Sequence, residues 1–384
     1  FFHKTKICQT KISLSNIFLS DRFIKVKNRQ LTKHTNLRML AVQISISTSR
    51  NILQTKLSLP IFGFGSAHLG EMYSLVDEET AQNTLEAAWN EGIRYYDTAP
   101  WYGRGLAEHR LGGFLRTKQR ESFIITTKVG RTLHRPSNLG TFKRDPWLGG
   151  LKFEVKFDYS YDGIMRSYEQ ALQRLSLDTV DALIIHDLDP LFHSPDEQIS
   201  HERDLEGSGI KALEELKNAG DIQAFGIGIN QKESLAKLAQ RLPLDFALVA
   251  MPYTLIDQES LNDGMEKCLK NSTSVIIGAP FASGILATGS GSNGKYGYIT
   301  ASKELQQKVR QIESVCQVHA VSLKAAALQF VLAHPAVVST IPGAVNSNQV
   351  KENIHFLQSK IPGTFWEELK AKNLIVKDAP TPKQ

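Results

Sequence analysis

Ionisable side chains stand at the ends of three short apolar runs in this sequence. Asp97 follows IRYY, Lys128 follows IITT and His186 follows LII. Tyr102 comes five residues after Asp97, in the segment DTAPWYG. A charged group at the end of an apolar run costs desolvation energy unless it has a partner, so packing alone accounts poorly for three such ends. Together the four residues indicate a catalytic site.

The chemistry open to these four residues is hydride transfer coupled to proton transfer. Reduction of a carbonyl needs a proton on its oxygen, and oxidation of an alcohol needs a base. A tyrosine phenol, with a free pKa of about 10, can serve both directions. Lys128 would stabilise the phenolate of Tyr102, and Asp97 would hold Lys128 by a charge-assisted hydrogen bond. His186 would donate a hydrogen bond to the substrate oxygen.

Eight short apolar runs, alternating with amphipathic stretches, frame these residues. The runs suit buried parallel strands, and they are Ile61–Ser66, Ile93–Asp97, Phe123–Lys128, Ala182–His186, Phe225–Ile229, Phe246–Val249, Val275–Gly278 and Val337–Ile341. The predicted helices are Glu78–Asn90, Tyr161–Leu175, Gly209–Ala219, Lys232–Gln240, Ser260–Leu269, Lys303–Val318 and Ser347–Gln358. This alternation favours an α/β fold, and its length suits a (β/α)8 TIM barrel.

A doubly wound sheet is the alternative fold. Its phosphate-binding signature GxGxxG is missing, because Gly226 and Gly228 in FGIGIN have neither the third glycine nor a following ribose-binding acid. In a barrel, polar residues at the carboxyl ends of strands face the active site. Asn230, which follows GIGI, therefore joins the three strand ends described above.

Three connections between these elements stand out. Thr141–Ser160, which contains Trp147, is long for a strand-to-helix loop and is predicted to shape a pocket. Ser194–Ser208 is a polar, acid-rich connection. Ser283–Tyr298 is rich in Gly and Ser and is predicted to be a flexible loop after the seventh strand.

The net charge of +6 is unevenly distributed along the chain. Residues 1–59 hold eleven Lys and Arg against one acid, and the other 325 residues hold 34 basic and 38 acidic groups. The body therefore has no basic footprint for nucleic acid. No stretch approaches the roughly 18 apolar residues of a spanning helix, so no membrane partner is expected.

Residues 1–49 are predicted to be a basic extension, followed by the barrel over 50–374 and a short tail over 375–384. The composition of the extension resembles an organelle transit peptide. Upstream or poorly ordered sequence, with Met39 as the true start, is the favoured interpretation. The extension should be dispensable for folding. We expect a cytoplasmic protein, with organelle import as the alternative.

Three cysteines, Cys8, Cys268 and Cys316, are far apart in the sequence. They form no CxxC pair and no metal-ligand spacing. This pattern is typical of inert thiols in a reducing compartment, and no metal site is predicted.

The segments GIRYYDTAPWYG, GLAEHRLGGFL, ITTKVGR and LIIHDLD together resemble the aldo-keto reductase superfamily. The resemblance covers residues 58–374 and implies a (β/α)8 barrel that works with a nicotinamide cofactor. It also implies a catalytic tetrad of Asp97, Tyr102, Lys128 and His186, in which the tyrosine is the general acid/base.

Within that superfamily, KVGR, FDYSYDGIMRSYEQALQRL and MPYTLIDQ resemble the branch of D-threo-aldose (L-fucose) 1-dehydrogenases and pyridoxal 4-dehydrogenases. The resemblance implies oxidation of an aldose at C1 to a lactone, or of a pyridoxal-like substrate. Reduction of small aldehydes or ketones, and a non-catalytic cofactor-binding barrel, are the alternatives. Trp101, Arg131 and Trp147 are the predicted walls of the substrate pocket. The oligomeric state stays open.

The resemblance also assigns residues to the cofactor. Asn230 matches the asparagine that binds the nicotinamide carboxamide. The other matching positions are Ser283, Gly284 and Leu286 over the pyrophosphate, and Gln349, Glu352 and Asn353 at the adenosine end.

The adenosine end bears on the choice between NAD and NADP. Phosphate-preferring members of the family carry Lys and Arg where this chain has Gly343 and Gln349. A 2′-phosphate is doubly charged and needs a cationic partner. The sequence therefore predicts NAD, with NADP as the alternative if Lys351 reached the phosphate.

Overall fold

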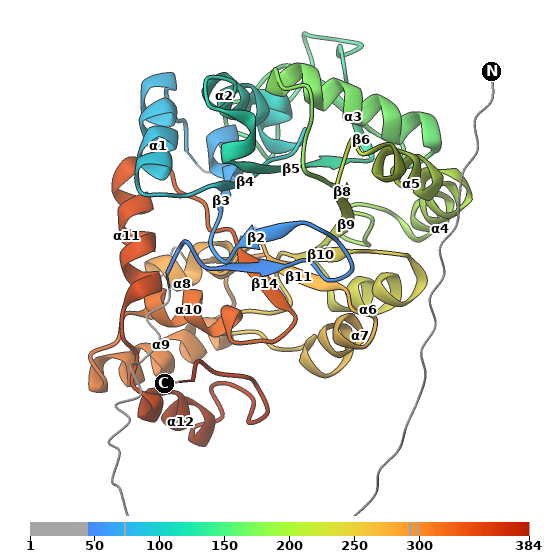
Figure 1. Cartoon of the computed structure of the whole chain (residues 1–384). Helices are drawn as coiled ribbons and strands as arrows, with labels where there is room; N and C mark the ends of the chain where they lie inside the picture. The colour runs from blue at the N-terminus through green and yellow to red at the C-terminus, as the bar shows by residue number, and fades with distance from the viewer. Residues whose placement is uncertain (1–44, 73, 292–293, 298, 384) are drawn as a thin grey trace, which may run out of the picture. The chain divides into compact units, whose positions relative to one another are not determined.

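The eight predicted strands form one parallel sheet with the order β14-β11-β10-β9-β8-β5-β4-β3. The structure is a computed structural model, and it describes residues 45–72, 74–291, 294–297 and 299–383 (Figure 1). The strands are β3 (Phe64–Gly65), β4 (Tyr95–Asp97), β5 (Ile124–Val129), β8 (Ala182–His186), β9 (Ala224–Ile229), β10 (Phe246–Val249), β11 (Ser274–Ile277) and β14 (Val337–Thr340).

The first and last strands of this sheet meet, which closes it. Phe62 forms a parallel bridge with Thr340, and the Gly63 amide donates to the Thr340 carbonyl at 2.9 Å. Helices cover the outside of the sheet (Figure 1). The prediction of a (β/α)8 barrel is confirmed.

Most helices lie where the sequence pattern places them. Four have the predicted bounds: α1 (Glu78–Asn90), α3 (Tyr161–Leu175), α9 (Lys303–Val318) and α11 (Ser347–Gln358). Three others differ by a residue or a turn: α5 (Ile210–Ala219), α6 (Lys232–Arg241) and α7 (Glu266–Lys270), which follows a π-helical turn over Leu261–Met265. The family-like segment GLAEHRLGGFL contains α2 (Leu106–Leu115). Local signals explain such agreement: Asp77 caps α1 by accepting the Thr80 amide at 2.7 Å.

The prediction of a polar connection over Ser194–Ser208 was wrong, because the helix α4 (Pro195–Asp204) lies within this segment. The Ser194 hydroxyl accepts from the Glu197 amide, the Glu197 carboxylate accepts from the Ser194 amide at 2.9 Å, and Pro195 opens the helix. This capping box was present in the sequence as Ser-Pro-Asp-Glu. The high polarity of the segment hid it.

Two further helices, α10 (Leu323–Leu332) and α12 (Gly363–Ala371), have no counterpart among the predicted elements. Nearly all of α10 is buried, so its sequence has no polar face and no amphipathic period. Among the described residues, no single helix is long and apolar enough to cross a membrane; α9 and α10 meet that test only as a pair bent by 101°.

The Gly- and Ser-rich segment Ser283–Tyr298 is also more structured in its described part than predicted. It contains the short helix α8 (Ile285–Thr288) and β12 (Lys295–Tyr296), which pairs with β13 (Ile299–Thr300). The Tyr296 hydroxyl donates to a carboxylate oxygen of Asp257. The segment predicted as a flexible loop therefore contains short regular elements in its described part, and its flexibility stays a prediction.

The interior of the barrel explains the GxG pattern that β9 carries. Interior residues include Tyr95, Ile184 and Phe246, which share one buried apolar cluster. A Cβ atom on Gly226 would lie 2.3 Å from the backbone oxygen of Phe246. Glycine at this position lets β9 pack closely against Phe246 of β10. This packing accounts for the glycine without a bound nucleotide.

A two-stranded hairpin covers the amino end of the barrel. It is formed by β1 (Ser49–Asn51) and β2 (Ser58–Pro60), and its Ile52 and Leu57 belong to the interior cluster. Arg50 donates to the carbonyls of Leu332, at 3.0 Å, and Val337.

Residues 1–44 of the extension that was predicted over residues 1–49 lie outside the described residues. Its last residues contact the barrel: Ser49 pairs with Pro60, the Ile61 amide donates to the Thr48 carbonyl at 2.8 Å, and Ile46 packs on the core. The structure therefore places the residues from 45 onward with the barrel.

We expect a chain that starts at Ser45 to unfold at the same urea concentration as the full chain. A control chain that starts at Ile52 lacks β1 and both Arg50 hydrogen bonds, each worth about 1 kcal/mol net. It should lose about 2–4 kcal/mol of unfolding free energy, measured by circular dichroism in urea. Equal stability of the two truncated chains would contradict this role of the hairpin.

Candidate functional site

Three of the four candidate catalytic residues lie at neighbouring strand ends in the barrel. In the register of the sheet, Asp97 on β4 pairs with Thr126 on β5, and Lys128 on β5 pairs with Ile184 on β8. Side chains two residues apart in a strand point the same way. Lys128 therefore shares the inner face with Thr126, and His186 shares it with Ile184.

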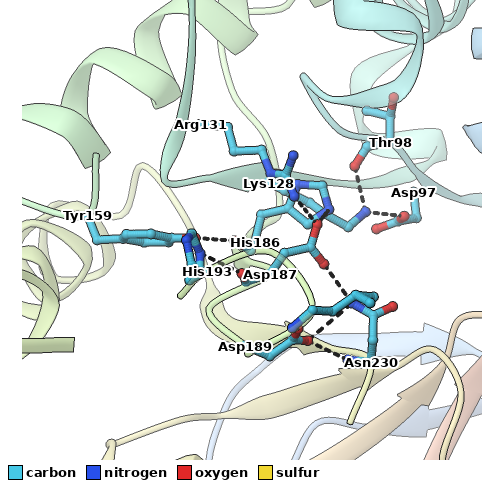
Figure 2. A network of polar contacts seen from close by, with 11 residues as sticks. Asp97, Thr98, Lys128, Arg131, Tyr159, His186, Asp187, Asp189, His193 and Asn230 are labelled. Atoms are coloured by element: carbon cyan, nitrogen blue, oxygen red, sulfur yellow. Dashed lines mark hydrogen bonds and ion pairs between the residues drawn. The ribbon is translucent and has the colours of Figure 1, made fainter. Parts of the chain in front are cut away.

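Asp97 and Lys128 form a buried ion pair. Lys128 Nζ donates to Asp97 Oδ2 at 2.6 Å and to the Thr98 carbonyl at 2.8 Å (Figure 2). The Thr126 hydroxyl donates to Asp97 Oδ1 at 2.8 Å. Burial raises the pKa of the Asp97 carboxyl, and the charge of Lys128 opposes that shift. A buried pair with such complete hydrogen bonding holds one geometry.

Tyr102 lies at the same end of the barrel, in the 3-10 turn η2 (Tyr102–Gly105). Lys128 Nζ lies 4.7 Å from the centroid of its ring, and the His186 ring meets it edge-on at 6.0 Å. The turn needs glycine at position 103 for two reasons. Gly103 has a left-handed backbone with φ of 62°, and a Cβ on Gly103 would lie 2.7 Å from the backbone of Gly70.

That Lys128 stabilises the phenolate of Tyr102 stays a prediction. Burial raises the pKa of the Tyr102 phenol well above its ordinary value, the carboxylates of Asp97 and Asp187 raise it further, and the charge of Arg131 opposes them. Both described hydrogen bonds of Lys128 go to Asp97 and Thr98, and its charge meets the face of the phenol ring. Tyr102 is therefore a protonated phenol at neutral pH in this structure.

His186 is a neutral imidazole. Burial lowers its pKa well below the ordinary value, and the positive charges of Arg131 and Lys128 lower it further. Its Nε2 lies 3.1 Å from Asp187 Oδ2, and its buried Nδ1 has no hydrogen-bond partner among the described residues. A neutral imidazole carries one N–H, which is the group that the predicted contact with a substrate oxygen needs.

The three predicted pocket walls are brought together beside Tyr102. The Trp147 ring lies 5.7 Å from the Trp101 ring and 6.1 Å from the Tyr102 ring. The Arg131 guanidinium lies 4.8 Å from the centroid of Trp101. Arg131 is only 2% exposed and is bonded to Asp187, so it stands behind the aromatic wall.

Trp147 lies in the long connection predicted over Thr141–Ser160, which contains the strand β7 (Glu154–Phe157). The insertion that carries Trp147 is therefore residues 135–153, and it joins β6 (Arg131–His134) to β7, which pair antiparallel. Glu71 accepts the Gly150 amide at 2.9 Å, and Arg104 donates to the Phe153 and Asp145 carbonyls at 2.9 and 3.1 Å. Sequence reasoning missed Glu71 and Arg104, because only tertiary contacts give them this role.

Sequence reasoning also missed Asp187 and Asp189, the two acidic residues that follow His186 along the chain. Asn230 Nδ2 donates to Asp187 Oδ1 at 3.0 Å, and the Asn230 amide donates to Asp189 Oδ2 at 2.9 Å (Figure 2). Arg131 Nη2 bonds to Asp187 Oδ2. The signal was available as two acids in HDLD at the end of a buried strand. Asn230 is thus held beside the catalytic candidates.

The candidate cofactor residues follow three strands, β9, β11 and β14. In the sheet, β14 is the neighbour of β11, and β10 lies between β11 and β9. After β11, Ser283 and Gly284 both have left-handed backbones, with φ of 57° and 109°. A Cβ on Gly284 would meet nothing within 4 Å, so this turn faces open space. Successive turns of this kind present backbone N–H groups that suit phosphate oxygens. Leu286 is buried beneath the turn.

At the predicted adenosine end, Asn353 is anchored in place. Its Nδ2 donates to the Gly343 carbonyl at 3.3 Å. Gln349 is exposed, and its Oε1 accepts the Val345 amide at 3.0 Å. Glu352 forms an ion pair at 3.2 Å with Lys324, a cation that sequence reasoning missed.

These features suit a ligand with several polar groups at the carboxyl end of the barrel. The buried hydroxyls of Ser66 and Thr98, just after β3 and at the end of β4, have no hydrogen-bond partner among the described residues. Such buried groups normally find a partner. With the open turn at Ser283, they fit a nicotinamide dinucleotide.

Comparison with known proteins decides the family. Residues 62–374 match the model of the Aldo/keto reductase family. The chain belongs to this family. It is therefore an oxidoreductase of the kind that uses NAD(H) or NADP(H) and acts on small aldehyde or sugar substrates.

The chain is 36% identical to a pyridoxal 4-dehydrogenase from Microbacterium luteolum over 342 residues, which are 87% of this chain and 100% of that protein. It is also 36% identical to a D-threo-aldose 1-dehydrogenase from a Pseudomonas species, over 85% of this chain and 96% of that protein. A solved aldo-keto reductase from Bacillus halodurans, in holo form, has a TM-score of 0.64 at 23% identity, covering 88% of this chain and 98% of its own. That likeness concerns the fold.

We expect Asp97→Asn to leave the buried Lys128 ammonium without a counter-ion, and to reduce the unfolding free energy by about 3–5 kcal/mol. Turnover should fall as well. Asp181→Asn is the control, since Asp181 pairs with Arg120 at 2.8 Å just before β8, at the amino end of the barrel. It should reduce stability in urea and leave turnover of the folded enzyme unchanged. An Asp97→Asn protein as stable as the native one would contradict the prediction.

Proposed function

We propose that this enzyme oxidises a cyclic hemiacetal, an aldose at C1 or a pyridoxal-like compound, to the lactone with NAD as hydride acceptor. The observation that carries the proposal is the position of Tyr102, whose ring lies between Lys128 and His186 at the carboxyl end of the barrel. The two relatives at 36% identity, named for pyridoxal and for D-threo-aldose, support the substrate class. Both compounds form rings in which one carbon carries a hydroxyl and a hydrogen.

The residues would divide this oxidation as follows. The C–H bond of the hemiacetal carbon would break, and a nicotinamide held beside Asn230 would supply the acceptor for the hydride. The hydroxyl proton would go to the Tyr102 oxygen once that residue is a phenolate, the form that acts as general base. His186 donates its N–H to the same substrate oxygen, and the Asp97–Lys128 pair fixes the charge beneath the Tyr102 ring.

The remaining candidates would hold the cofactor. Asn230, fixed by Asp187 and Asp189, would bind the nicotinamide carboxamide. The turn at Ser283 and Gly284 would receive the pyrophosphate, and Asn353 would contact the adenine. The oxidised nicotinamide supplies the hydride acceptor when it is bound.

The raised pKa of Tyr102 sets the pH dependence of each direction. Oxidation needs the phenolate, whose fraction grows as the pH rises toward the raised pKa, so its rate should climb from pH 7 to pH 10 without a plateau. Reduction needs the phenol, which is the stable form over the same range. The reverse reaction should therefore vary little with pH.

We expect NAD-dependent oxidation of at least one substrate in a panel of L-fucose, D-arabinose, L-galactose and pyridoxal, followed as NADH absorbance between pH 6 and pH 10. Tyr102→Phe keeps the ring and removes the hydroxyl, so kcat should fall by about 10² or more. NADH affinity, measured by fluorescence, should change little. Near-native turnover of Tyr102→Phe would overturn the assignment.

The protonated state of Tyr102 favours one alternative, the reduction of small aldehydes or ketones by NADH, in which the phenol is the proton donor. The same assays separate the two functions. Rapid aldehyde reduction without any oxidation of an aldose or pyridoxal at pH 9 would make the protein a reductase.

We propose NAD as the preferred cofactor. The exposed Gln349 carries no charge, and Lys324 is already paired with Glu352. A lysine at position 343 has no room, because a Cβ on Gly343 would lie 2.3 Å from His68 Nδ1. Neither family position for a phosphate-binding cation is therefore filled.

We expect a higher kcat/KM with NAD than with NADP, and a shift of that ratio toward NADP by about tenfold in Gln349→Arg, the scale of one charge-assisted contact. His355→Arg is the control, since it adds the same charge to an exposed position of the same helix, α11. It should leave the ratio unchanged. A native enzyme that prefers NADP would refute the proposal.

A further inference from the structure

Asp187 is the first residue after β8, and its carboxylate contacts three candidate site residues. Its Oδ2 bonds to Arg131 Nη2 and lies 3.1 Å from His186 Nε2, while its Oδ1 accepts from Asn230 Nδ2 at 3.0 Å (Figure 2). Its backbone is left-handed, with φ of 53°, and its carbonyl lies 3.1 Å from His193 Nε2. The carboxylate therefore has one fixed position beside the imidazole.

The Arg131–Asp187 pair is buried almost completely, with side chains 2% and 9% exposed. The guanidinium is surrounded by three aromatic rings, with centroids at 4.8, 4.5 and 4.7 Å for Trp101, Phe157 and Phe192. A delocalised guanidinium accepts such an environment better than an ammonium does.

Stability alone does not explain this pair. A buried ion pair is often no more stabilising than apolar residues of the same size, because both charges lose their hydration. Its position is the informative feature, since one of its oxygens faces the nitrogen of a catalytic candidate. The pair therefore needs an explanation in terms of His186.

The charges around His186 show what Arg131 does. A lone buried carboxylate 3.1 Å from Nε2 would favour the imidazolium form. The charge of Lys128, which is already paired with Asp97, also lowers the pKa of His186. The Tyr102 ring meets the imidazole edge-on, and the Tyr159 hydroxyl donates to the His186 carbonyl at 2.7 Å. Burial and the Asp189 carboxylate raise the pKa of Asp187, and the charge of Arg131 lowers it. Arg131 is thus the group that cancels the charge of Asp187.

We propose that Arg131 and Asp187 are a positioning pair: the Asp187 carboxylate fixes the position of the His186 imidazole from its Nε2 side, and Arg131 cancels the carboxylate charge so that the imidazole stays neutral. A neutral imidazole neither releases nor captures a proton during the reaction, and its one N–H would reach the substrate oxygen when that oxygen takes the place of Asp187 Oδ2 beside Nε2. Proton transfer is then left to Tyr102. The effect on turnover rests on the proposed function, whereas the state of His186 does not.

The test uses the full chain with Arg131→Met, Arg131→Met/Asp187→Asn and Arg120→Met. Asn keeps the size of Asp and tolerates the left-handed backbone at position 187. Arg120→Met removes the cation of another largely buried pair, with Asp181, at the amino end of the barrel, and is the matched control. Histidine ring signals are followed by NMR between pH 5 and pH 9, and His186→Asn identifies the signal of His186.

In the native protein and in Arg120→Met, the His186 signal should not titrate. In Arg131→Met, a new ionisation should appear in this range at His186, and kcat/KM should fall at least tenfold on its acidic side. The double variant should lose that ionisation and regain the native pH profile. If Arg131→Met does not fold, Arg131→Lys takes its place: it keeps the charge, so it should show no new ionisation and only a several-fold loss in kcat/KM.

The proposal is overturned if His186 in Arg131→Met behaves as in the native protein, if the double variant keeps the new ionisation, or if Arg131→Lys acquires one. The NMR measurement needs no turnover. An enzyme that oxidises none of the hemiacetals but shows the predicted titration would therefore remove the proposed function and leave the positioning pair intact. Oxidation with an unchanged His186 titration would do the reverse.

Discussion

The charged groups buried at the carboxyl end of this barrel are held by opposite charges or by hydrogen bonds: Lys128 pairs with Asp97 and Arg131 with Asp187, and Asp189 accepts from the Asn230 backbone amide and from Asn230 Nδ2. Lys128 lies inside the sheet near the end of β5, and its ammonium is held by Asp97 and by the Thr98 carbonyl. The ammonium lies 4.7 Å from the centroid of the Tyr102 ring. Burial raises the pKa of the Tyr102 phenol well above its ordinary value, and the carboxylates of Asp97 and Asp187 raise it further, so the phenol keeps its proton at neutral pH.

The same constraint acts on the other side of His186. Asp187 and Arg131 neutralise each other there, so the imidazole lies between two compensated pairs (Figure 2). Two cations nearby and little water favour the neutral ring. The site thus combines a protonated phenol with a neutral imidazole, so Tyr102 has to lose its proton before it can accept the hydroxyl proton of a hemiacetal.

The sequence predicted the barrel well because each strand is a separate apolar run and most helices keep one polar face. It failed at α10, which is buried all round, and at α4, whose capping box lies within an acid-rich stretch. The catalytic candidates could be found because strand ends converge in a barrel. The pKa of Tyr102 could not, since it depends on burial and on Asp187, which only the folded chain brings near.

The substrate wall and the acid/base are fixed to the same backbone. The insertion that carries Trp147 is bound to the turn after Tyr102, because the Leu151 amide donates to the Gly103 carbonyl at 2.9 Å and Arg104 donates to two carbonyls of the insertion. These contacts use backbone atoms of residues 135–153, so the side chains there can vary without moving the phenol. Substitutions in that insertion can therefore change the aromatic wall beside Tyr102 while the backbone contacts that hold the turn after Tyr102 are preserved.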